Sequence, residues 1–130
     1  MRMGHNDSAT ILVVDDVEEI RDGLQFLLES DGYRVDAARS EEYAIECAIR
    51  KPPQLILVNL AGPPEDVIAA ARRISRNASL QDSVPVVLFC VEGIDGVEVH
   101  HGGSLYSTWP DNFNDLRQFV RHLLNSPPSQ

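Results

Sequence analysis

The stretch Thr10-Ile-Leu-Val-Val-Asp-Asp16 begins as a short apolar run and stops abruptly at two adjacent acidic residues. A run that is apolar on both faces and rich in β-branched residues is typical of a central strand in a parallel sheet. A second such run, Leu55-Ile-Leu-Val58, stops at Asn59, and a third spans residues 84–90 with Pro85 near its start, where a missing N–H is tolerated. These runs predict three central strands of one sheet.

Amphipathic segments alternate with the strands. Apolar residues recur at helical spacing over residues 17–30, and Gly32 follows as a stop signal. We also predict helices over the segment that Ser40 caps and Pro52 ends, over 65–76 and over 112–125, with shorter strands over 33–37 and 105–108. Residues 92–101 are predicted as a short or irregular helix, because Gly93 and Gly96 weaken the helical pattern.

The alternation of strand and helix predicts the fold class. It indicates an α/β domain with a doubly wound, parallel, five-stranded sheet, (βα)5, and helices on both faces in a three-layer sandwich. One domain is expected over residues 9–125, with flexible tails at 1–8 and 126–130.

Composition excludes several classes of function. The net charge of -9 argues against direct binding to nucleic acid or to an anionic membrane, although it permits a basic protein partner. Cys47 and Cys90 are far apart and have no metal-ligand spacing. No signal peptide and no apolar run of about 20 residues is visible, so we expect a reduced, cytoplasmic location.

Polar or unusual side chains follow the predicted strands. In doubly wound sheets, sites form outside the carboxyl ends of the strands. We therefore expect one edge of the sheet to gather Asp15, Asp16, Asn59, Cys90 and Trp109. The acid pair is open to two interpretations: both carboxylates bind a hard cation such as Mg²⁺, or one caps the next helix and the other is solvated.

Several of these segments resemble one family, the response regulator receiver domains of two-component signalling. Residues 11–16 resemble the opening of those domains, and Pro53-Gln-Leu-Ile-Leu-Val-Asn-Leu60 is similar to their phospho-acceptor strand. Residues 84–90 resemble their fourth strand, and Thr108-Trp109-Pro110 the segment that carries their Lys-Pro pair. The resemblance covers about residues 9 to 124. It implies a flavodoxin-like fold in which an aspartate takes a phosphoryl group with Mg²⁺, while a Thr or Ser and a Lys contact that group.

The resemblance also shows what this chain has lost. Asn59 stands at the acceptor position, and an amide nitrogen is not a usable nucleophile. Cys90 replaces the hydroxyl and is a weak hydrogen-bond donor, while Trp109 replaces the lysine and supplies no cation. We therefore interpret the chain as a pseudo-receiver that is not phosphorylated and is not an enzyme.

The resemblance places Mg²⁺ ligands at Asp16, the Asn59 side chain and the Ala61 carbonyl. Because Asn59 is uncharged, we expect no firmly held cofactor and at most a weak or vestigial metal site at Asp15 and Asp16. Tyr106 and Trp109 are candidate switch or interaction residues. The Trp109 ring either covers the site or is an exposed anchor for a partner, and a cis Trp109–Pro110 bond is left open.

The leading hypothesis is a protein-interaction module in bacterial two-component signalling, with partner and oligomeric state undetermined. One alternative is a receiver regulated by a noncovalent ligand or cation at the acid pair, and another is a small-ligand-binding flavodoxin-like domain. Two further alternatives use the histidines: a thiol enzyme built from Cys90 with His100 or His101, and a transition-metal site built from His100 and His101 with Asp15 or Asp16.

Overall fold

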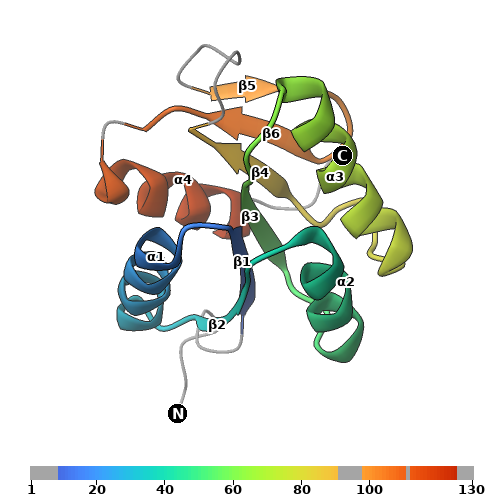
Figure 1. Cartoon of the computed structure of the whole chain (residues 1–130). Helices are drawn as coiled ribbons and strands as arrows, with labels where there is room; N and C mark the ends of the chain where they lie inside the picture. Colours follow the sequence, from blue (N-terminus) through green and yellow to red (C-terminus); the bar gives the residue numbers. More distant parts are fainter. Residues whose placement is uncertain (1–8, 91–97, 111, 126–130) are drawn as a thin grey trace.

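The computed structural model describes residues 9–90, 98–110 and 112–125. A central sheet lies between two pairs of helices, with α1 and α4 on one face and α2 and α3 on the other (Figure 1). In chain order, the elements are β1 (Thr10–Asp15), α1 (Glu18–Ser30), β2 (Arg34–Ala38), α2 (Glu41–Arg50), β3 (Leu55–Asn59), α3 (Pro64–Asn77), β4 (Val86–Phe89), β5 (Glu98–His100), β6 (Leu105–Thr108) and α4 (Phe113–Asn125).

The strands form one sheet in the order β2-β1-β3-β4-β6-β5. Neighbours from β2 to β6 pair in parallel, which confirms the predicted doubly wound arrangement, and β5 pairs antiparallel with β6. The winding reverses between β1 and β3, and a crevice forms at such a switch point in doubly wound sheets. In the register of these two strands, Asp15 lies opposite Asn59.

The alternation of side chains along the central strands builds two cores. Leu12 and Val14 of β1 pack with α2 and α3, whereas Ile11 and Val13 pack with α1 and α4. The same alternation holds along β3, all of whose apolar side chains are fully buried. Fully burying one such side chain contributes about 1.5–3 kcal/mol, so the runs that predicted the strands also supply much of the stability.

Caps and ion pairs hold the helices against each other. The Ser40 hydroxyl accepts a hydrogen bond from the Tyr43 N–H, as predicted for the N-cap of α2. Arg73 of α3 binds both carboxylate oxygens of Glu41, which joins α3 to α2. Arg117 of α4 binds both oxygens of Asp31 at the end of α1, which joins the helices of the other layer.

The prediction of a helix over residues 92–101 was wrong at its end. Residues 98–100 form β5, and residues 92–97 lie outside the described residues. Gly102 and Gly103 adopt φ of 99° and 58°, so they form a turn that folds β5 back onto β6. The described part of the chain therefore has six strands and four helices, where the sequence predicted five strands and five helices.

Two smaller differences concern the ends of elements. β4 covers Val86–Phe89 rather than 84–90, because Pro85 has no N–H to donate and Cys90 leaves the extended conformation with φ 58°.

None of the described helices has the length and apolarity that crossing a lipid bilayer requires.

Candidate functional site

Asp15, at the carboxyl end of β1, is completely buried. Its Oδ1 accepts a hydrogen bond of 2.8 Å from the Val17 N–H, just before α1 begins. No hydrogen bond of normal geometry reaches Oδ2 among the described residues. The Asn59 side chain is close enough to oppose, in small part, the rise in the pKa of this carboxyl. An orphaned carboxylate oxygen at this depth is costly, because an unpaired buried charge loses its hydration.

Burial is the main cause that raises the pKa of Asp15, and the negative charge of Asp16 adds to it. The Val17 N–H, the Arg21 guanidinium and the Asn59 amide oppose that rise. Arg21 donates a 2.7 Å hydrogen bond to the backbone carbonyl of Asp15, so it does not neutralise Oδ2 directly. The pKa of this carboxyl is therefore above its ordinary value, which favours the protonated form.

Asp16 differs sharply from its neighbour. It is exposed, and its Oδ2 accepts a 3.4 Å hydrogen bond from the Ala61 N–H in the loop after β3. Neither acid is the N-cap residue of α1, which is Val17 with no side-chain cap. The predicted cap was therefore only partly right: Asp15 binds an N–H next to the helix, but from a buried position inside the sheet.

The atoms at this edge offer a limited set of metal donors. Asp15 Oδ2 and the Asp16 carboxylate are the oxygens that would hold a hard cation, and the uncharged side chain of Asn59 lies next to Asp15. The orphaned Oδ2 shows that a cation would find an unsatisfied donor there. Within the described ranges, no three acidic, histidine or cysteine side chains are grouped as a metal site would require. This donor set suits a weakly held cation at most.

Cys90 follows β4 at the same edge of the sheet. It is half-buried, and its N–H donates a 3.1 Å hydrogen bond to the Thr108 carbonyl. Burial raises the pKa of its thiol, and the charge of Asp15 raises it further. A thiol in this setting stays protonated at neutral pH and is a poor nucleophile.

Trp109 follows β6 and keeps 44% of its surface exposed. Both interpretations of its ring, as a cover over the site and as an anchor for a partner, stay predictions. No cis peptide bond occurs among the described residues, so the Trp109–Pro110 bond is trans. Tyr106, in contrast, is half-buried and held between two rings, stacked on His100 with centroids 4.8 Å apart and edge-on to Phe119 at 6.2 Å.

His100 and His101 lie toward the amino ends of the parallel strands, away from the acid pair. His100 pairs with Tyr106 in the β5–β6 register, and the His101 N–H binds the Leu105 carbonyl at the amino end of β6. Their Nε2 atoms contact the Gly103 carbonyl and the Ser107 hydroxyl, each at 2.7 Å. The topology thus contradicts both a Cys–His thiol site and a His–Asp metal site, because Cys90 and the acid pair follow the carboxyl ends of their strands.

The sequence correctly predicted which strand ends the site residues follow. The prediction missed the difference between the two acids, because the pair Asp15-Asp16 taken by itself does not indicate which side chain turns inward. The alternation of β1 supplied a usable signal: Ile11 and Val13 face one core, and Asp15 is the next residue on that side.

Comparisons with known proteins agree with this geometry. The family model described as the response regulator receiver domain matches residues 11–100. The chain is 33% identical over 120 residues to the phosphate regulon transcriptional regulatory protein PhoB of Pseudomonas aeruginosa, covering 88% of this chain and 51% of that protein. The chain thus spans about half the length of this curated relative.

Two further similarities extend the comparison. An uncharacterized 14.6 kDa protein of Leptolyngbya boryana is 29% identical over 122 residues, covering 91% of this chain and 92% of that protein. A crystal structure of the histidine kinase ThkA in complex with the response regulator protein TrrA, from Thermotoga maritima, matches with a TM-score of 0.69 and 22% identity. That match covers 90% of this chain and 99% of the other, and at this identity it shows the shared fold alone.

Proposed function

This chain belongs to the response regulator receiver family, and from that premise we propose that it is a receiver domain that cannot be phosphorylated and that acts through protein contacts in two-component signalling. One observation carries the proposal. Asn59 occupies the end of β3, opposite Asp15 at the switch point of the sheet, where the resemblance places the phospho-accepting carboxylate. An amide there cannot form an acyl phosphate.

The neighbours of Asn59 support the same conclusion. Stabilising a phosphoryl group at this edge would need donors and positive charge around its oxygens. Cys90 offers a weakly donating thiol, and Trp109 offers a ring without charge. No other strand end among the described residues brings a lysine to this edge. We therefore propose that the site does not accept a phosphoryl group. The absence of enzymatic activity stays a prediction.

Charge balance supports the loss of function as well. An aspartate at position 59 would place a third carboxylate beside Asp15 and Asp16, and such a cluster would need a cation. With Asn59, only Asp15 is both acidic and buried, and a single proton removes its charge. The edge can thus stay folded without the metal or the lysine of an ordinary receiver, because the other carboxylate, Asp16, is exposed to water.

We propose that partners bind near the exposed Trp109. Tryptophan is enriched at binding hot spots because it buries a large apolar area with few rotamers to fix. Val17, also 44% exposed, is the N-cap residue of α1 at the same edge of the sheet. In the ThkA–TrrA crystal structure, a response regulator is bound by a histidine kinase, so a kinase is one reasonable partner class. The cytoplasmic location expected from the sequence stays a prediction.

Amide NMR of the full chain tests this proposal. We expect neither Mg²⁺ with beryllofluoride nor Mg²⁺ with acetyl phosphate to cause specific, saturable shifts around Asp16 and Asn59 beyond those of Mg²⁺ alone. Saturable shifts with the phosphoryl mimic would overturn it. Trp109→Ala should leave the spectrum of the free domain largely unchanged outside its surroundings, because the side chain is half exposed.

A second candidate function is supported by the orphaned Oδ2 of Asp15. A cation bound there and at Asp16 would satisfy that atom and could regulate the domain without phosphorylation. Mg²⁺ alone decides this in the same titration. Saturable shifts around Asp15 and Asp16 that are lost in Asp16→Asn would favour regulation by a cation, and linear, unspecific shifts would exclude it.

A further inference from the structure

A groove of about 500 Å³ opens at the amino ends of the strands, opposite the candidate site that contains Asp15, Asn59 and Cys90. It lies between the second half of α3, the amino ends of β4 and β6, and the turn of the β5–β6 hairpin. Its volume falls within the range of about 300–1,000 Å³ that is typical of small-molecule sites. In doubly wound folds, ligands usually bind at the other edge, so this groove is separate from the site described above.

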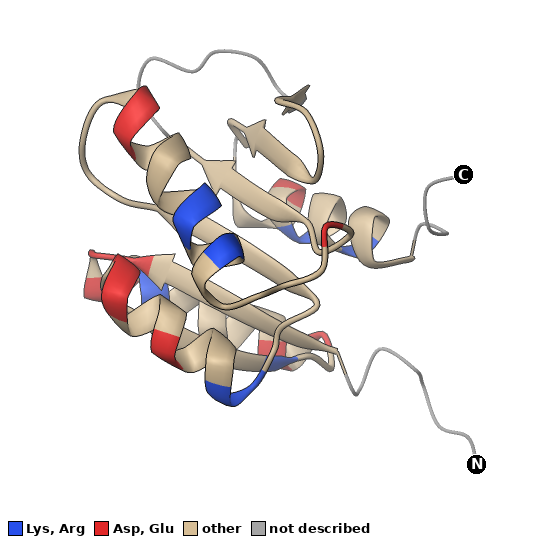
Figure 2. Cartoon of the chain, turned by 90° about the vertical axis from the view of Figure 1, so that its right-hand side faces the viewer, with Lys and Arg blue, Asp and Glu red and all other residues tan. Residues whose placement is uncertain are grey.

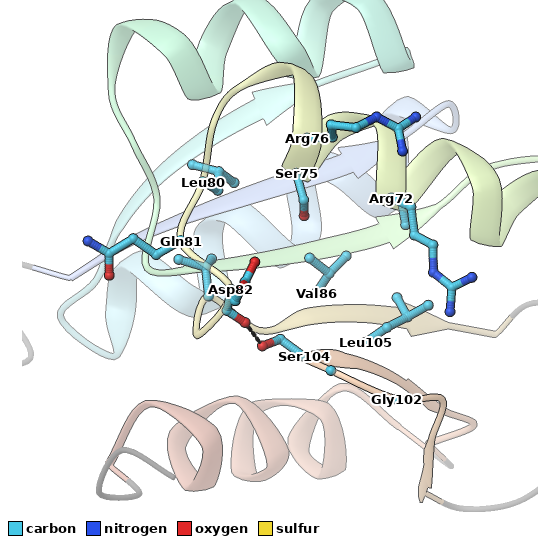
Figure 3. Close-up of a pocket in the computed structure, with 13 residues that line it drawn as sticks. Arg72, Ser75, Arg76, Leu80, Gln81, Asp82, Val86, Gly102, Ser104 and Leu105 are labelled. Atoms are coloured by element: carbon cyan, nitrogen blue, oxygen red, sulfur yellow. Dashed lines mark hydrogen bonds between the residues drawn. The ribbon is translucent and has the colours of Figure 1, made fainter.

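The groove has an apolar floor and one basic wall. Val86 and Leu105 lie between Arg72 and Arg76 on one side and Gly102 and Ser104 on the other (Figure 3). Ala71, Leu80 and Val84 extend the apolar lining. A ligand with an apolar body would displace water from this floor at about 0.8 kcal/mol for each buried CH₂ group.

Among the described residues, neither arginine of the wall forms an ion pair. Arg73, which lies between them in sequence, turns away to α2 and binds Glu41 through two nitrogens. Arg72 makes only a long 3.5 Å contact with the His101 carbonyl, and no ion pair reaches Arg76 within the described residues. Figure 2 shows the resulting contrast along α3, acidic at its start and basic in its second half.

The charge of the groove is opposite to that of the chain. The lining holds two arginines and one acidic residue, Asp82, whereas the whole chain has a net charge of -9. The opposite wall leaves room for a ligand, because a side chain placed at Gly102 or Gly103 would meet nothing within 4 Å. The carbonyl oxygens at the end of α3 are already bonded to the N–H groups of residues 78–80, so they do not compete for the arginines.

We propose that this groove binds a small amphipathic carboxylate, whose anionic group lies against Arg72 and Arg76 and whose apolar chain covers Val86 and Leu105. Both parts of the ligand are needed. The floor alone would accept any apolar molecule, and exposed arginines alone would bind small anions only weakly, because water and salt screen them. The combination selects for a carboxylate with an alkyl or aryl body, and it does not depend on whether the domain can be phosphorylated.

The test uses the full chain labelled with ¹⁵N, and hexanoate as the probe. We expect saturable amide shifts at residues 72–76 and 102–105, with no comparable shifts at Asp15 or Asn59. Acetate, which lacks the apolar chain, and 1-hexanol, which lacks the charge, should each bind at least about tenfold more weakly. Equal binding of hexanol, shifts centred elsewhere, or the absence of saturation would overturn the proposal.

Three variants make the assignment specific to these residues. Arg72→Ala with Arg76→Ala should weaken hexanoate binding about tenfold, through the loss of charge-assisted hydrogen bonds. Asp82→Asn should strengthen it about twofold, because a nearby like charge is removed. Arg39→Ala, a control at the opposite edge, should leave it unchanged. All four positions are exposed, so the variants should fold. If the double variant bound hexanoate as tightly as the unchanged chain, the arginines would not hold the carboxylate and the proposal would be wrong.

Discussion

Replacing Asp15 by asparagine is the perturbation that most sharply tests the physical picture of the site. Asparagine has nearly the same shape, so Asp15→Asn leaves no cavity, and its Oδ1 can keep the 2.8 Å hydrogen bond from the Val17 N–H. The bond from Arg21 is also kept, because it goes to the backbone carbonyl. What changes is the charge on a completely buried side chain with an orphaned Oδ2.

The expected effect is a stabilisation at neutral pH. Leaving a buried polar atom unsatisfied costs about 1–3 kcal/mol, and more if the group is charged. The Nδ2 amide that replaces Oδ2 is also a buried polar group, so Asp15→Asn removes only the added cost of the charge and should increase the free energy of unfolding by about 1 kcal/mol at pH 7. Asp16→Asn, at an exposed side chain, is the matched control and should change it by less than about 0.5 kcal/mol.

The pH dependence of stability independently predicts the sign of the effect of Asp15→Asn on the free energy of unfolding. Burial raises the pKa of Asp15 in the folded state, so the folded state binds a proton more tightly than the unfolded chain. The resulting stability is fully present below the unfolded pKa of about 3.9 and is lost as pH rises through the folded pKa. The advantage of Asp15→Asn should accordingly be near zero at low pH and grow as pH rises.

Urea unfolding followed by circular dichroism, in EDTA and across a series of pH values, measures both effects. If Asp15→Asn were less stable than the unchanged chain at pH 7, the buried carboxylate would have a stabilising partner, and the reasoning would be wrong. Repeating the series with Mg²⁺ adds a second check, since a bound cation would stabilise only the chain that keeps Asp15.

Two further substitutions test the contacts between helices. Ser40→Ala should cost about 1 kcal/mol, because the Tyr43 N–H at the start of α2 loses its acceptor, and thermal unfolding should show this at every pH. Arg117→Ala should lower the Tm by a few degrees at neutral pH, since it breaks the pair with Asp31. Arg117 lowers the pKa of Asp31, so this pair stabilises the fold above the ordinary aspartate pKa and stops doing so as pH falls through the folded pKa. A loss of Tm that stayed constant down to strongly acidic pH would show that packing, not charge, is responsible.

The central strands were predictable because their runs are short, rich in β-branched residues and bounded by turn or polar residues. A strand such as Leu55–Val58, apolar on both faces, needs a covering layer on each face, and the alternation with amphipathic segments indicates that helices supply both layers. Ser40 was predictable as a cap for a similarly local reason, since its hydroxyl and the Tyr43 N–H are three residues apart. Local rules of this kind determined most of the α/β order.

The β5–β6 hairpin was not predictable from the same rules. A three-residue strand has almost no pattern of its own, and β5 exists because β6 lies alongside it. Gly102 and Gly103 are a turn signal, but Gly93 and Gly96 lie only a few residues before them, and that pattern equally indicates a weak helix. The groove beside the hairpin follows from tertiary placement, so no local pattern indicates it.

The sequence predicts which residues form the candidate site, but it does not predict how strongly the two acids differ in burial and charge. That Asp15, Asn59 and Cys90 follow strand ends is visible in the sequence, and the parallel sheet brings such ends to one edge. The burial of Asp15 and the exposure of Asp16 depend on the position of β1 in the middle of the sheet, between β2 and β3. The alternation of apolar side chains along β1 indicates which acid turns inward, but the structure is needed to show that Asp15 is completely buried and that its Oδ2 has no hydrogen-bond partner among the described residues.

Intact-mass spectrometry after incubation with acetyl phosphate and Mg²⁺ tests the central claim most directly. The unchanged chain is predicted to gain no phosphoryl group, because Asn59 cannot form an acyl phosphate. Asn59→Asp, the matched variant, should gain one slowly, since Cys90 and Trp109 still supply neither a hydroxyl nor a cation. A hydroxylamine-labile phosphoryl group on the unchanged chain, whether at Asp15, at Asp16 or elsewhere, would contradict the account.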